Sequence, residues 1–206
     1  MRTLIAIPAF DTVQTLFMTS LLSLRKPEGT NIKVCTGSLV YDARNTLAME
    51  AIRGGYDRIL WLDSDMVFDP DMMERLNADL DTGLDCVCAA YFTRKAPVRP
   101  VVYKALDVVD GVPTNTPVDT IPEEIFEVAG MGFGAVMMRI GVFHAMGDLR
   151  PFSPLPGWGE DLSFCLRMRE KGFRMWCDGR VNVGHLGISI IDASTWAGAQ
   201  KEGDRP

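Results

Sequence analysis

The sequence predicts an α/β fold: a mostly parallel sheet flanked by helices, with a short antiparallel and irregular insertion. Two observations lead to this prediction. Short apolar runs alternate with helical patterns through the first half of the chain, which is typical of a parallel sheet covered by helices. The alternation then breaks down over residues 93–128, which carry five prolines and an Asp110-Gly111 hairpin signal.

The first half contains five elements in clear order: a strand at Thr3–Ile7, a helix at Thr12–Leu24, a strand at Asn31–Thr36, a helix at about Asp42–Arg53 and a strand at Arg58–Leu62. Pro8 ends the first strand, and Gly54-Gly55 ends the second helix. Asp69-Pro70 predicts the start of a third helix, because aspartate caps helices and proline suits their first position.

The second half is less regular. We expect a strand at about Asp85–Tyr91, a strand pair over Phe126–Ile140 bent around three glycines, a proline-rich loop at Pro151–Gly159, a helix at about Glu160–Lys171, and strands at Phe173–Cys177 and Val181–His185. The insertion at 93–128 is expected at the open end of the sheet, where loops specific to a substrate usually lie.

Size and composition indicate one globular domain. The 206 residues match the usual domain size of roughly 100–200 residues, and we expect the domain to span 1–197 with a frayed polar end at 198–206. Hydrophobic residues at 47% and charged residues at 23% exclude disordered, collagen-like and coiled-coil classes.

Charge and cysteine content limit the partners and the location. The net charge of −6, with no basic block, disfavours non-specific nucleic-acid binding. No apolar run approaches about 18 residues and the N-terminus has no secretory pattern, so we expect neither a membrane span nor a signal peptide. The five cysteines contain no C-x-x-C pair, which favours reduced core thiols in a cytoplasmic protein.

The spacing Asp-x-Asp occurs three times, so spacing alone identifies no site. Only Asp63-Ser64-Asp65 follows a buried strand of the alternating half, where open α/β sheets bind their ligands. The pairs Asp69/Asp71 and Asp79/Asp81 are interpreted as a helix cap and a solvated helix end. Capping is also the structural alternative for the first pair, but two carboxylates without a structural task suit a divalent cation held against phosphate oxygens.

His185 is one of two histidines and follows a predicted strand in a glycine-flanked stretch. A single histidine is more often structural, and we assign His144 to structure. Combined with Asp63 and Asp65, however, the imidazole of His185 would shift the preferred metal from Mg²⁺ toward Mn²⁺.

Three further features each allow two interpretations. Glu160-Asp161 either complements a helix dipole or supplies a general base. Arg44-Asn45 lies either on a solvated helix face or against a phosphate. The glycines of 130–134 precede a strand, so they fail the context of a dinucleotide-binding loop and mark either a close approach to a ligand or a bend in the sheet.

Taken in order, these pieces resemble small, family 2-like glycosyltransferases with the GT-A fold, which use nucleotide sugars. The matching parts are Ile7-Pro8-Ala9, Ala43-Arg44-Asn45, Ile59 to Met66 with Asp63-Ser64-Asp65, the 130–134 glycines, and Trp158-Gly159-Glu160-Asp161 leading to Gly184-His185. No single motif is specific, and the resemblance rests on their order and separation. It covers most of the chain except 93–128 and the tail.

The resemblance implies a metal-dependent transfer of a sugar from a nucleotide-diphosphate sugar, with a UDP-sugar favoured, to a carbohydrate or another acceptor that bears a hydroxyl. It places Pro8, Ala9 and Phe10 around the base, and Arg44, Asn45, Asp63, Ser64 and Asp65 at the nucleotide. Asp63, Asp65 and His185 would hold Mn²⁺ or Mg²⁺, and Asp161 with Glu160 would be catalytic, Asp161 as the base of an inverting transfer. The chain has no separate acceptor domain, so an oligomer or a partner chain is one way to complete the site.

Two other functions stay open. A module that binds nucleotide sugars without turnover would keep the Asp63/Asp65 site. A phosphatase of the haloacid dehalogenase type would use Asp63 as a nucleophile. That family needs a downstream lysine and a further acidic pair at a strand end, whereas Lys95 and Lys104 lie in the irregular region and Glu160-Asp161 opens a helix.

Overall fold

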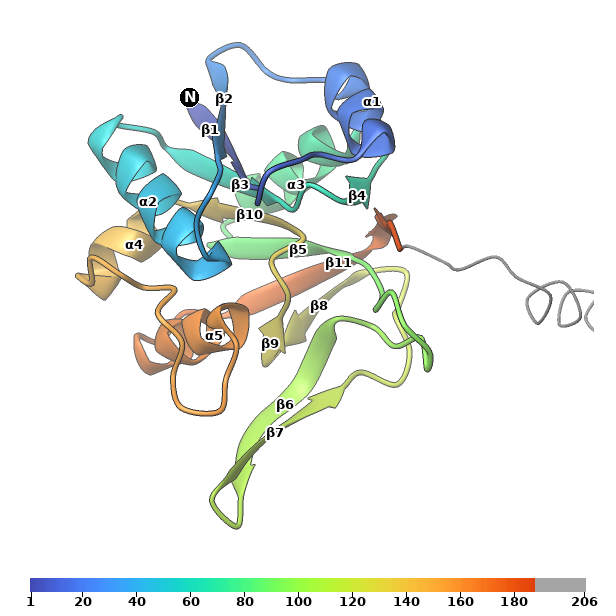
Figure 1. The fold of residues 1–206 in the computed structure, drawn as a ribbon, viewed down its shortest axis with the longest axis vertical. Helices are drawn as coiled ribbons and strands as arrows, with labels where there is room; N and C mark the ends of the chain where they lie inside the picture. The colour runs from blue at the N-terminus through green and yellow to red at the C-terminus, as the bar shows by residue number, and fades with distance from the viewer. Residues whose placement is uncertain (188–206) are drawn as a thin grey trace, which may run out of the picture.

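A seven-stranded sheet runs through the centre of the computed structural model, which describes residues 1–187 (Figure 1). The strand order is β2-β1-β3-β10-β5-β11-β8. The strands are β1 (Thr3–Pro8), β2 (Thr30–Cys35), β3 (Arg58–Leu62), β5 (Cys86–Ala90), β8 (Ile125–Val128), β10 (Ala135–Arg139) and β11 (Met175–Asn182). β2, β1 and β3 run parallel, as do β5 and β11, whereas β10 and β8 are antiparallel to their neighbours.

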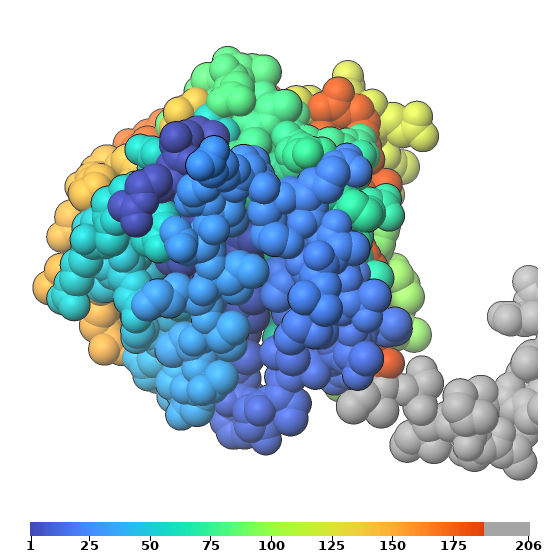
Figure 2. All heavy atoms as spheres, turned by 90° about the horizontal axis from the view of Figure 1, so that it is seen from above, coloured from blue at the N-terminus to red at the C-terminus, as the bar shows by residue number. Residues whose placement is uncertain are grey.

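Helices cover both faces of this sheet. On one face lie α2 (Val40–Arg53), α4 (Gly141–Met146) and α5 (Glu160–Glu170), and on the other α1 (Thr15–Ser23) and α3 (Met72–Asp81). Seen from above, β2 and α1 form much of the visible surface, with α2 beside them (Figure 2). Side chains of β3 alternate between the two cores, Trp61 facing one and Leu60 and Leu62 the other. Burial on both faces explains why this strand is apolar throughout.

Two small sheets complete the fold. β6 (Val102–Val109) pairs with β7 (Val112–Pro117) and β9 (Gly130–Met131), and β4 (Met66–Val67) pairs with β12 (Gly184–His185). The β6–β7 hairpin extends away from the body (Figure 1), and its turn has positive φ at Asp110 and Gly111, as the hairpin signal predicted. The β4–β12 pairing places His185 opposite Met66, one residue after Asp65.

Three helix starts differ from the sequence-based prediction. α1 begins at Thr15 rather than Thr12, because the N–H of Gln14 donates to the carbonyl of Ser64 at 3.2 Å and keeps the preceding segment extended. α2 begins two residues earlier than expected. The predicted cap at Asp69-Pro70 is wrong: α3 starts at Met72 after Asp71, and Asp71 makes no side-chain cap bond.

The prediction that Asp79 lies at a solvated helix end is also wrong. Its side chain is buried between α3 and β11, beside Asp178 and 3.4 Å from the Nη2 atom of Arg180. Burial and the neighbouring Asp178 raise the pKa of Asp79 to about 6. Asp81 is exposed as expected and pairs with Arg58.

Residues 126–140 do not form the expected strand pair. β8 pairs with β11, β9 pairs with β6, and β10 inserts between β3 and β5. The glycines here allow close packing: a Cβ on Gly132 would lie 2.0 Å from the Tyr91 hydroxyl, and one on Gly134 would lie 2.1 Å from Cε of Met66. Gly134 also donates its N–H to the Tyr91 hydroxyl at 3.3 Å. These glycines therefore accommodate a tyrosine of the protein itself.

The two C-terminal strands differ in length from the prediction. β11 begins at Met175, two residues after the predicted start, and continues to Asn182 through an irregular register between Asp178 and Asn182. Of the predicted strand Val181–His185, only Gly184–His185 forms a separate strand, β12. The five cysteines are free thiols, and four of them are buried. Among residues 1–187, every helix is too short or too polar to cross a bilayer. The predicted domain end at 197 and the tail 198–206 lie outside the described residues and stay predictions.

We predict that Gly132→Ala lowers the free energy of unfolding by about 1–3 kcal/mol, because the added methyl group must displace Tyr91. Urea denaturation measures this loss. Gly141→Ala is the matched control, since a methyl group added there would meet nothing within 4 Å, and it should be nearly neutral. Adding Tyr91→Phe to Gly132→Ala removes the clashing hydroxyl and should restore part of the stability; no loss in Gly132→Ala would contradict the packing role.

Candidate functional site

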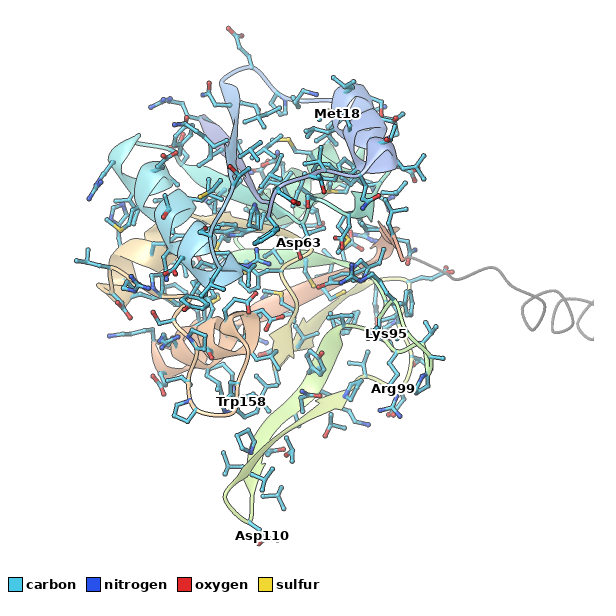
Figure 3. The ribbon with its side chains drawn as sticks, viewed as in Figure 1. Met18, Asp63, Lys95, Arg99, Asp110 and Trp158 are labelled. Carbon is cyan, nitrogen blue, oxygen red and sulfur yellow. The ribbon has the colours of Figure 1, made fainter. Side chains whose placement is uncertain are left out.

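Asp63, Ser64 and Asp65 directly follow β3, at the edge of the sheet where the parallel strand β1 also ends. Figure 3 shows Asp63 near the centre of the molecule. The N–H of Asp63 donates to the carbonyl of Gly134 at 3.0 Å, which fixes the chain as it leaves the sheet. The two carboxylates then take different partners, Arg44 for Asp63 and Arg94 for Asp65.

Arg44 is a buried cation on α2, with its side chain only 3% exposed. Its Nη2 atom donates to Oδ1 of Asp63 at 2.9 Å, and its Nε atom lies 3.5 Å from Oε1 of Glu160. Its guanidinium carbon lies 5.5–5.9 Å from the ring centroids of three aromatic residues, Trp61, Phe133 and Phe152. The interpretation of a solvated helix face is wrong for Arg44, because the helix presents it to the interior.

Charge pairing keeps this buried arginine ionised. Burial alone would lower the pKa of Arg44, but the carboxylates of Asp63, Glu160 and Asp161 outweigh burial and raise it. Burial and the nearby Asp65 raise the pKa of Asp63, although Arg44 works in the opposite direction. Arg44 thus ties the end of β3 to the start of α5.

Asp65 lies between a cation and an imidazole. The Nη1 atom of Arg94 donates to Oδ2 of Asp65 at 2.7 Å, and the Nε2 atom of His185 lies 3.5 Å from the same oxygen. Burial would raise the pKa of Asp65, but His185 and Arg94 lower it overall. For His185, burial would lower the pKa and the contacts with Asp65 and Phe92 raise it.

The orientation of His185 is determined on its other side. Its Nδ1 atom lies 2.9 Å from the carbonyl oxygen of Phe92, which can only accept, so Nδ1 carries a proton. The ring of Tyr91 packs edge-on against the imidazole at 5.5 Å between centroids. These contacts direct Nε2 toward Asp65, the orientation that a metal-binding histidine needs.

Glu160 and Asp161 form the first turn of α5. Glu160 points to Arg44, whereas Asp161 accepts a 2.7 Å bond from the N–H of Leu162. Burial, followed by the charge of Glu160, raises the pKa of Asp161 to about 6. A carboxylate with this pKa is ionised at neutral pH and is more basic than an ordinary aspartate, which suits a general base.

Three adjoining cavities run along this edge. An apolar one of about 200 Å³ is lined by seven residues: Pro8, Ala9, Phe10, Ser38, Leu39, Val40 and Ala43. A second, of about 230 Å³, shares Phe10 with the first and includes Ser64 and Asp65. A third, of about 600 Å³, shares Arg94 with the second and is lined by His185 and Tyr91. The shared residues place the three cavities side by side along this edge, and together they are called the groove below.

The predicted metal ligands are only partly brought together. Within residues 1–187, no three or more His, Cys, Asp or Glu side chains form a group that could hold a metal ion. Asp63 is engaged by Arg44, which leaves Asp65 and His185 as neighbours. A carboxylate and an imidazole fit Mn²⁺ as two ligands, provided that a bound substrate supplies oxygens for the rest.

The contacts of Asn45 and Arg94 were not predicted from the sequence. Asn45 is buried, and its Oδ1 atom accepts a 2.9 Å bond from the N–H of Phe152, so its contacts in the structure are structural. Arg94 was not singled out in the sequence, yet it contacts Asp65. The sequence could have indicated Arg94 as a site residue, because it follows the predicted strand that ends at Tyr91, at the same edge of the sheet.

Comparison with known proteins shows the fold. No protein-family model matches the sequence, and no curated protein matches it either. Among solved structures, A197 from STIV matches with a TM-score of 0.65 and 20% identity over 91% of this chain and 87% of that chain. GalNAc-T7, crystallised with UDP, GalNAc and Mn²⁺, matches with a TM-score of 0.64 and 14% identity over 90% of this chain. The fold is GT-A-like. The match spans 44% of the GalNAc-T7 chain.

We predict that Arg44→Leu destabilises the protein by about 3–5 kcal/mol at pH 7, because it leaves Asp63 and Glu160 without their shared cation. The loss should shrink near pH 4, where the raised pKa of Asp63 lets that carboxyl take up a proton. Denaturant unfolding at both pH values tests this. Arg53→Leu, an exposed position on the same helix, is the control; equal effects at 44 and 53 would contradict the pairing role of Arg44.

Proposed function

We propose that the chain is a glycosyltransferase that moves a sugar from a nucleotide-diphosphate sugar, a UDP-sugar being favoured, to an acceptor hydroxyl. The observation that carries the proposal is the contact of Asp65, which lines the middle cavity of the groove, with His185, which lines the larger cavity at Tyr91. The GT-A-like fold supports it, as does the presence of UDP and Mn²⁺ in the similar structure of GalNAc-T7.

The donor would lie along this groove. The nucleotide base would occupy the apolar cavity lined by Pro8, Ala9 and Phe10, and the diphosphate would follow past Ser64 and Asp65. Asp63 would face the ribose, and Arg44 would act through Asp63 by holding its carboxylate in place. A role for Asn45 in binding the nucleotide stays a prediction.

Asp65 and His185 would hold the divalent cation together with the donor's phosphate oxygens. When bound, such a cation offsets the charge that develops on the departing nucleoside diphosphate. In the structure, Arg94 neutralises Asp65, so this arginine must move aside or turn to the phosphates when the donor binds. His185 is already oriented for the task by the carbonyl of Phe92.

Asp161 would take the proton from the acceptor hydroxyl as that oxygen attacks the anomeric carbon, in an inverting transfer. Its pKa of about 6 leaves it mostly ionised at neutral pH. Glu160 raises that pKa while Arg44 holds Glu160, so Glu160 is a positioning residue for the base.

The other candidate functions have less support. The phosphatase would need a lysine near Asp63, but the partner of Asp63 is Arg44, and Lys104 pairs with Asp119. A module that binds nucleotide sugars without transferring them would have the same groove. Only an assay of sugar transfer distinguishes it from a glycosyltransferase. The cytoplasmic location and an oligomer or partner chain stay predictions from the sequence.

We predict that UDP binds at least about tenfold more tightly with Mn²⁺ than in excess chelator, because Asp65 and His185 would hold the metal and the metal would offset the charge of the diphosphate. Calorimetry measures both affinities. Asp65→Ala should remove the difference, whereas Asp69→Ala, which changes an exposed aspartate outside the groove, should keep it. Equal affinity with and without metal in the unmodified protein would contradict the metal assignment.

For catalysis, we predict that kcat/KM for transfer rises with pH through about 6, because Asp161 must lose its proton to act as the base. Asp161→Asn should abolish this rise and lower turnover by about 10²–10⁴-fold with nearly unchanged UDP affinity. UDP release from a panel of UDP-sugars and acceptors provides the rate. An Asn variant with normal turnover would remove Asp161 from the mechanism.

The same substitution has an opposite effect on stability. A pKa raised above its unfolded value means that the folded state favours protonated Asp161, so its contribution to stability falls as pH rises from about 4 to 6. Asp161→Asn should therefore stabilise the chain at pH 7.5 by about 1–2 kcal/mol. A loss of stability in urea unfolding would instead indicate that Asp161 serves the helix dipole.

A further inference from the structure

The largest of the three cavities along the groove, about 600 Å³, carries a cluster of positive charge of which the proposed donor site uses only Arg94. Three of its lining residues, Arg94, Lys95 and Arg99, come from one loop between β5 and β6. Figure 3 shows Lys95 and Arg99 on this loop, to one side of Asp63. The remaining walls include Tyr91, Val101 and His185.

The loop that bears these cations is closed at its base. Phe92 and Pro100 form an antiparallel bridge. The N–H of Thr93 donates to the carbonyl of Arg99 at 2.9 Å, and the N–H of Arg99 donates back to the Thr93 hydroxyl at 3.1 Å. These bonds hold Arg94, Lys95 and Arg99 around one concave surface.

Among residues 1–187, the positive charge in this cavity is only partly balanced by carboxylates. Arg94 is paired with Asp65, but Lys95 and Arg99 take part in no ion pair among the residues that the structure describes. Among the described residues, three cations against the one carboxylate of Asp65 leave a net charge of two positive when the imidazole of His185 is counted as neutral. Since the whole chain carries −6, this cluster opposes the general charge of the protein. Like charges held together in a cavity favour binding of an anion.

We propose that this cavity binds the phosphate group of a phosphate-bearing acceptor. The proposal rests on the proposed function and names the acceptor class. A phosphomonoester carries nearly two negative charges at neutral pH, which matches the unbalanced charge, and the guanidinium group of Arg99 can hold two of its oxygens at once.

The donor's diphosphate would bind in a different part of the groove from the acceptor's phosphate. Ser64 and Asp65 line the smaller cavity of about 230 Å³, to which Arg94 also contributes, but Lys95 and Arg99 line only the larger one. Arg94 therefore lies at the boundary between the donor and acceptor sites. Lys95 and Arg99 belong to the acceptor side.

Phosphate binding without a donor tests the proposal directly. Calorimetry at low salt with inorganic phosphate and with glycerol phosphate should show binding that Lys95→Ala/Arg99→Ala weakens at least about tenfold, since each charge-assisted bond lost costs about that much. The control Arg53→Ala/Lys171→Ala removes the same charge from exposed sites that form no ion pair in the described chain, and should leave affinity within about twofold. Equal losses in the two double variants, or no phosphate binding, would overturn the proposal.

Two further arms separate the alternatives. UDP affinity should be unchanged in Lys95→Ala/Arg99→Ala, and a matching loss of UDP affinity would overturn the assignment to the acceptor. Binding to phosphatidate vesicles but not to phosphatidylcholine vesicles, lost in the same variant, would identify a lipid as the source of the phosphate; binding of glycerol phosphate alone would identify a soluble acceptor. Phosphate binding that depends on Lys95 and Arg99 supports the site even if no sugar transfer is detected. Failure of the proposed transferase function can therefore be distinguished from failure of the phosphate site.

Discussion

The buried charge of Arg44 is the constraint on which the candidate site depends. A guanidinium group excluded from water is tolerated only when it is paired, and its partners Asp63 and Glu160 come from the end of β3 and the start of α5. Three aromatic rings exclude water around it. The end of β3 and the first turn of α5, which carries the candidate base Asp161, are therefore held in a fixed relation by one side chain.

Arginines and carboxylates alternate through the candidate site, and each arginine determines which groups its carboxylate partner can contact. Arg44 keeps Asp63 engaged, which leaves Asp65 as the carboxylate that faces His185. Arg94 balances Asp65, and beyond it Lys95 and Arg99 have no ion-pair partner within residues 1–187. An acceptor with a phosphate would meet charge of the opposite sign at Lys95 and Arg99, whereas the donor's diphosphate would rely on a cation held by Asp65 and His185.

Local signals predicted much of this molecule, and long-range contacts account for what they missed. The buried strand β3 and the Asp110-Gly111 hairpin are encoded by neighbouring residues, so both were confirmed. The separate partners of β8, β9 and β10, and the burial of Asp79 against Asp178, depend on residues far apart in sequence. In the site, Asp65 and His185 lie 3.5 Å apart, and their role as metal ligands stays a prediction. The pairing of Asp63 with Arg44 was not foreseen, because a sequence does not show which way two carboxylates so close in the chain turn.

A crystal structure with UDP and Mn²⁺ bound tests the central claim most directly. We expect the uracil ring in the apolar cavity at Pro8, Ala9 and Phe10, and the diphosphate and metal at Asp65 and His185, with Arg94 no longer paired to Asp65. UDP bound elsewhere, or bound with its diphosphate on Lys95 and Arg99 and no metal at Asp65, would contradict it.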